Sequence, residues 1–256
     1  MPVLLAHEGI DANLADSDGR TALHFAAEFG HAAVVTALLG HEGINANKAD
    51  SRGGTPLHYA ADEGYVEVVT ALLGHKRIQI SKSDRDGVTP LHSAASFGPE
   101  IVTMLLVQEG IAANKTDNHG RTALHFAAEL GAALEQTMFM HSCRLCNFGV
   151  CYTCFQGRGC IDANNADRNG WTPLHDAARN GHAEIVTALL GHEGIDVNKV
   201  DGYGRTPLHT AIRNNHVEAV IALHNIREVV LAEVRRDGQA LQYAGGALRN
   251  DREGVL

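Results

Sequence analysis

Aromatic residues, clustered basic residues and long apolar runs are all scarce in this chain of 256 residues. Only 5% of the residues are aromatic, and 21 Lys and Arg face 30 Asp and Glu, which gives a formal charge of −9. Nucleic acids and anionic membranes bind clustered positive charge, so the composition argues against both as partners. No apolar run approaches the roughly 18 residues of a membrane span, and the start does not resemble a leader peptide. We expect a soluble intracellular protein, cytoplasmic or nuclear.

Cysteine is absent from residues 1–142 and 161–256, because all five cysteines fall between residues 143 and 160. The fold therefore does not depend on disulfides, which favours a reducing compartment. The motifs G-x-S-x-G, G-x-x-x-x-G-K-[ST], H-E-x-x-H and G-x-G-x-x-G are absent too, so no standard catalytic or nucleotide-binding site is indicated. We expect a protein that is not an enzyme and that needs no cofactor.

A pattern of fifteen residues recurs along the chain, for example "DSDGRTALHFAAEFG" at 16–30 and "DRNGWTPLHDAARNG" at 167–181. Asp and Gly suit a tight turn, Thr caps a helix, and Pro or Ala fits its first turn. A second apolar helix follows, such as "VEVVTALLG" at 66–74. Neither helix can bury its apolar face alone, so the units must stack into an all-α solenoid. The units begin at Asp16, Asp50, Asp84, Asp117, Asp167 and Asp201.

The T-P-L-H-x-A-A core resembles the ankyrin repeat, and the resemblance covers residues 1 to about 224, with the array proper at 16–224. It implies an all-α solenoid of stacked helix pairs and turn loops that acts as a scaffold for another protein. It further implies that the histidine of each T-x-L-H segment is a neutral hydrogen-bonding link between adjacent turns. These structural histidines are His24, His58, His92, His125, His175 and His209.

The same resemblance points the residues after T-P-L-H toward a concave face made of turn tips and first helices. There the sequence varies most between units, as expected of a surface that selects one partner. Aromatic and arginine side chains dominate binding hot spots, although partial burial between units is the alternative for Phe25, Tyr59 and Phe126. The predicted partner-binding residues are Phe25, Glu28, Tyr59, Asp62, Phe126, Trp171, Asp176, Arg179 and Arg213.

The two ends depart from the repeat. Residues 1–15 match only the tail of a repeat, so we expect either a monomer or a fragment of a longer array. Near residue 225 the pattern stops, and "REVVL" at 227–231 returns as "REGVL" at 252–256. Residues 225–256 resemble a family of short helical repeats of unknown function, and a helical cap for the solenoid is the favoured interpretation.

The interval between Asp117 and Asp167 is 50 residues instead of 33 or 34, because residues 141–160 replace a four-residue loop. Two C-x2-C pairs in this insertion have the spacing of zinc half-sites, and the segment resembles the latter half of a ZZ-type zinc finger. A redox-active loop and an insertion without structure are further alternatives. A zinc-binding or redox-active adaptor is therefore the alternative function. The candidate zinc ligands are Cys143, Cys146, Cys151 and Cys154.

The repeat that carries the insertion is expected to be a weak joint. Two adjacent positions that are apolar elsewhere, such as Val34 and Val35, are Glu135 and Gln136 there. Polar residues in a buried slot each cost on the order of 1–3 kcal/mol. We therefore expect two cooperative blocks, before about residue 131 and after about residue 161. Uniform hydrogen-exchange protection through residues 117–166 would contradict the weak joint, and protection indifferent to a chelator would contradict a structural zinc.

Overall fold

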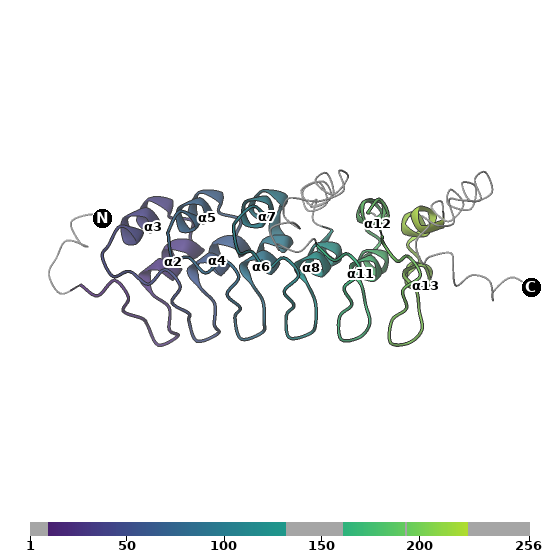
Figure 1. Ribbon diagram of the computed structural model, residues 1–256, viewed down its shortest axis with the longest axis horizontal. Coiled ribbons are helices and arrows are strands. Elements are labelled where there is room, and N and C mark those ends of the chain that lie inside the picture. The colour runs from purple at the N-terminus through teal and green to yellow at the C-terminus, as the bar shows by residue number, and fades with distance from the viewer. Residues whose placement is uncertain (1–9, 132–160, 193, 225–256) are drawn as a thin grey trace, which may run out of the picture.

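The computed structural model describes residues 10–131, 161–192 and 194–224, and these residues form a row of stacked helix pairs with hairpin loops (Figure 1). The first helix of each pair lies between the hairpins and the second helices. The first helices are α2 (Ala22–Glu28), α4 (Pro56–Asp62), α6 (Pro90–Phe97), α8 (Ala123–Leu130), α11 (Pro173–Asn180) and α13 (Pro207–Arg213). The second helices are α3 (Ala32–Leu39), α5 (Val66–Leu73), α7 (Pro99–Leu106) and α12 (Ala183–Leu190).

Residues 217–224 are helical as well. Among the described residues, extended pairing is limited to one isolated bridge between Ala15 and Thr21. The all-α solenoid predicted from the sequence is thus confirmed. Over the same ranges, every helix is too short or too polar to cross a membrane.

An aspartate at the start of each hairpin folds the turn. Asp50 Oδ1 accepts hydrogen bonds from the backbone N–H groups of Arg52 and Gly54, both at 2.8 Å. Gly53, between them, has φ +86°, and a Cβ on it would lie 2.8 Å from the backbone nitrogen of Arg85 in the next hairpin. Glycine is therefore required both by the turn conformation and by the close approach of the neighbouring repeat. Arg85 N–H in turn donates to the carbonyl oxygen of Arg52 at 2.9 Å, which ties the two hairpins together.

The first helices pack closely because their buried faces carry small residues. In α4, Leu57, Ala60 and Ala61 are fully buried. Thr55 is the N-cap and Pro56 occupies the first turn, where its missing N–H would have no partner in the helix. Each first helix can therefore approach its neighbours in the adjacent repeats, and the buried residues form one continuous core.

The third repeat explains the single interval of 33 residues. In the second repeat, α4 ends at Asp62, and Glu63, Gly64 with φ +77° and Tyr65 lead to α5. In the third repeat, Phe97 is the last residue of α6, and Gly98, in an extended conformation, leads directly into α7. The ring of Phe97 lies against Gly64 and leaves no room for a Cβ there. One residue is thus lost from the link between the two helices, not from the hairpin.

The hydrogen bonds that join adjacent hairpins and adjacent loops are also present between the repeats on either side of the insertion. Arg168 N–H donates to the carbonyl oxygen of His119 at 2.9 Å, the same bond that joins other hairpins. Asp162 N–H donates to Asn114 Oδ1 at 2.8 Å. The first helices α8 and α11 are therefore direct neighbours. The polar pair at 135–136, the cysteines at 143–160, residues 1–9 and the C-terminal segment at 225–256 lie outside the described residues, so the weak joint in the second-helix row stays a prediction.

Candidate functional site

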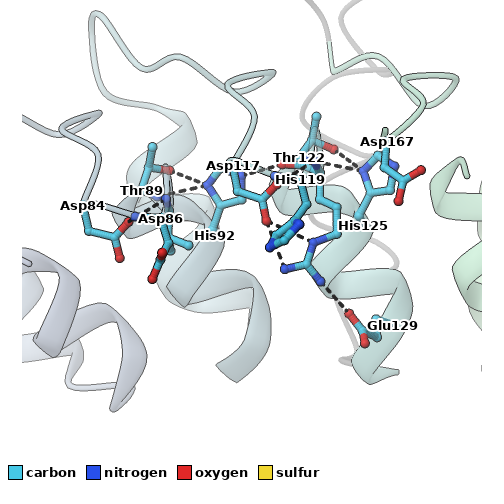
Figure 2. A network of polar contacts seen from close by, with 12 residues as sticks. Asp84, Asp86, Thr89, His92, Asp117, His119, Thr122, His125, Glu129 and Asp167 are labelled. Carbon is cyan, nitrogen blue, oxygen red and sulfur yellow. Dashed lines mark hydrogen bonds and ion pairs between the residues drawn. The ribbon is translucent and has the colours of Figure 1, made fainter. Parts of the chain in front are cut away.

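In every first helix except α13, a histidine joins one repeat to the next, as Figure 2 shows around His92 and His125. The Nδ1 atom of His125 accepts the backbone N–H of Thr122 at 3.0 Å, so the ring proton lies on Nε2. Nε2–H then donates to the carbonyl oxygen of Trp171 in the next hairpin at 3.1 Å. His24, His58, His92 and His175 make the same two contacts, with Nε2 3.0–3.2 Å from a carbonyl oxygen of the following repeat.

These five histidines are held in the neutral form. All are buried, and burial lowers the pKa of each, that of His125 to about 4, although the hydrogen bond to the neighbouring carbonyl works in the opposite direction. A protonated ring would also turn its Nδ1–H toward the N–H of the capping threonine. As pH falls, these histidines take up protons in the unfolded chain before they do so in the folded chain, because folding lowers their pKa. The stability that the links contribute is therefore lost as pH falls below 6.5.

His209 occupies the same slot but differs from the other five. It is exposed, and its Nδ1 lies 2.8 Å from Thr206 Oγ1. No carbonyl group within the described ranges meets its Nε2, because no described hairpin follows this repeat. The link between repeats expected of all six histidines is therefore seen at five of them.

One surface of the array is defined by three positions in each repeat, and all of its members are at least partly exposed except Thr210, which is buried. The three positions are the residue before the capping threonine, the residue after the histidine, and the residue three positions further on. We call this surface the first-helix face. The residues are, in order along the array, Arg20, Phe25 and Glu28; Gly54, Tyr59 and Asp62; Val88, Ser93 and Ser96; Arg121, Phe126 and Glu129; Trp171, Asp176 and Arg179; Arg205, Thr210 and Arg213.

In the first and fourth repeats, an arginine covers a phenylalanine ring. The guanidinium carbon of Arg20 lies 4.2 Å from the centre of the Phe25 ring, and Arg20 pairs with Glu28. Arg121 repeats the arrangement at 4.4 Å from the Phe126 ring and 3.2 Å from Glu129. The predicted partner-binding residues include both rings and Glu28 but not these two arginines. The signal that could have found them is the segment "GRTALHFAAE", which is identical in both repeats.

The aromatic residue of the second repeat is bound within its own repeat. The hydroxyl group of Tyr59 donates a hydrogen bond of 2.5 Å to Asp50 Oδ2, and burial together with this bond raises the pKa of Tyr59 to about 12. The ring is half-buried and packs edge-on against His24. Tyr59 is thus fixed by contacts inside the array, whereas Asp62 on the next turn is exposed.

The fifth repeat carries the same three chemical types in a different order. Arg179 lies over the ring of Trp171, with 5.2 Å from its guanidinium carbon to the ring centre. The half-buried carboxyl group of Asp176 accepts no hydrogen bond from any described residue. Burial, and next the negative charges of Glu129 and Asp167, raise the pKa of Asp176 to about 8. This repeat therefore combines an exposed arginine with an acid that is largely protonated at neutral pH.

A metal site is not evident in the part of the chain that the structure describes. No group of three or more His, Cys, Asp or Glu side chains there is arranged to hold a metal ion. The four candidate zinc ligands lie outside that part, so zinc binding stays a hypothesis drawn from the sequence.

Comparison with known proteins agrees with the fold. A family model described as ankyrin repeats (3 copies) matches residues 2–84, 76–136 and 139–229. The chain belongs to the ankyrin repeat family. The crystal structure of the human ASB11 ankyrin repeat domain is similar to this ankyrin array, with a TM-score of 0.65 and 23% identity over 88% of this chain and 90% of that one. At this identity the likeness concerns the fold alone. No curated protein matches the sequence.

We predict that His125→Ala lowers the free energy of unfolding by about 1–3 kcal/mol at pH 7, because it leaves buried partners without a hydrogen bond. His209→Ala is the matched control: it removes the same side chain from the same slot at an exposed position, and should cost a few tenths of a kcal/mol at most. Urea unfolding at pH 7 and pH 5 measures both. The cost of His125→Ala should shrink at pH 5, and equal costs for the two variants would contradict the link.

A second prediction concerns Asp176, whose pKa is raised toward 8 in the folded chain. The folded state then binds a proton that the unfolded state releases between about pH 4 and pH 8, so this group reduces stability as pH rises through that range. Asp176→Asn should raise the melting temperature by at least about 2 °C at pH 8 and by less at pH 5. Asp86→Asn, at an exposed hairpin tip, is the control. The same gain at both pH values would contradict the assignment.

Proposed function

We propose that this ankyrin array is a non-catalytic scaffold that binds a partner protein through its first-helix face. Ankyrin repeats are protein-interaction modules in general, which supports the class of function. The observation that favours this face is that aromatic and arginine side chains are at least partly exposed on it. Phe25 is 38% exposed, and Trp171 and Phe126 are half-buried beside arginines. These are the residue types that dominate binding hot spots.

The hydrogen bonds that hold the first helices in place favour binding as well. Each first helix except α13 is fixed by a buried histidine and a hairpin bond to the next repeat, and these contacts do not involve the exposed side chains. A surface that is already ordered loses little conformational entropy when a partner binds. Tyr59 is the weaker of the predicted anchors, because its hydroxyl group is already bound to Asp50.

We predict that Phe25→Ala together with Trp171→Ala weakens binding to the partner at least tenfold, which corresponds to about 1.4 kcal/mol. The partner would be captured with the tagged full-length chain and purified, and its affinity measured by calorimetry. Val107→Ala, which truncates an exposed apolar residue at the end of α7, is the control. Circular dichroism checks that all variants are folded. An unchanged affinity in the double variant would exclude this face as the binding surface.

A further inference from the structure

The last residue of each triplet on the first-helix face forms a row in which the sign of charge reverses. From the first repeat to the fourth the row is acidic or neutral, and in the fifth and sixth it is basic. The reversal falls between Glu129 on α8 and Arg179 on α11. In order, the row consists of Glu28, Asp62, Ser96, Glu129, Arg179 and Arg213.

The two basic members of the row keep their charge free toward solvent. Arg20 and Arg121 are neutralised by Glu28 and Glu129, and Arg205 by Asp201 at 2.7 Å. Within the described ranges, by contrast, neither Arg179 nor Arg213 has an ion pair, and both are exposed. Arg179 is held over the Trp171 ring, which orients its guanidinium group without neutralising it.

The acidic groups near Arg179 and Arg213 do not neutralise the positive charge of these arginines. Asp176 is the one acid on the α11 part of the face, and its pKa near 8 leaves it largely protonated at pH 7. The α13 part of the face carries none: its members are Arg205, Thr210 and Arg213. A chain with a formal charge of −9 thus presents a local basic surface over two neighbouring helices.

We propose that the α11–α13 part of the first-helix face binds an acidic segment of the partner protein, with Arg179 and Arg213 as the groups that hold its carboxylates. The inference rests on the proposed function and names the chemistry of its ligand. Guanidinium groups form strong, directional hydrogen bonds with carboxylates.

The spacing of the two arginines sets the spacing expected in the ligand. Packed helices lie about 8–10 Å apart, and three residues of an extended chain span about 10 Å. An extended segment with acidic residues at positions i and i+3 can therefore contact Arg179 and Arg213 together. A nucleic acid fits less well, because its charge is continuous along the chain and would also face Glu129 and Asp167 at the border of the surface, whereas a peptide can place uncharged residues there.

A library of random 12-residue peptides on phage, selected against the immobilised full-length chain, tests the proposal. We expect enriched clones to contain Asp or Glu pairs three residues apart. A synthetic peptide made from such a clone should bind the Arg179→Glu, Arg213→Glu double variant at least tenfold more weakly than the native chain. Replacing its acidic residues by Gln should weaken binding to the native chain by a similar factor.

The control variant is Lys76→Glu with Arg77→Glu, which makes the same change in net charge in an exposed loop after α5. It should change the affinity less than twofold. Selected clones without acidic residues, or an equal loss in the control, would overturn the proposal. Tighter binding of a twelve-residue oligothymidylate, with displacement of the peptide, would overturn it in favour of a nucleic acid. Peptides that bind equally to the native chain, to the Arg179→Glu, Arg213→Glu variant and to the Phe25→Ala, Trp171→Ala variant would contradict the proposed function as well, because they would bind outside the first-helix face.

Discussion

The neutral imidazole that joins a threonine cap to the carbonyl group of the following hairpin is the contact on which the array depends. It satisfies a buried N–H and a buried carbonyl with one side chain and fixes a helix start against the next turn. Both ring nitrogens are engaged, so the ring has one tautomer and one orientation. The first helices, the hairpins and the face they form therefore have defined positions relative to one another.

Most of the fold could be predicted from the sequence, because its rules are local. The aspartate, the glycine and the threonine of each unit act within a few residues, and the recurring apolar residues show which sides of the helices must be buried. The location of the insertion between a helix pair and a hairpin is inferred from alignment of the units and stays a prediction, because residues 132–160 lie outside the described residues. The cysteines within it fall outside the described residues, so zinc binding by them stays a prediction from the sequence.

The candidate face was harder to predict, because its character arises from contacts between positions that the repeat does not relate. Sequence reasoning named Phe25, Tyr59 and Trp171 together as anchors. In the structure the first is covered by an arginine, the second is bound through its hydroxyl group, and the third supports an arginine. The environment of Asp176 depends on Glu129 across the long interval, which no inspection of a single unit reveals.

The hydrogen bond between adjacent hairpins affects how the repeat array can evolve. It joins a backbone N–H of one hairpin to a backbone carbonyl of the hairpin before it, and the histidine link likewise ends on a backbone carbonyl. Neither bond depends on which side chains the neighbouring unit carries. Whole units can therefore be duplicated, lost or exchanged without new joints having to evolve. The join between α8 and α11, made across the longest interval in the array, is an instance of that interchangeability.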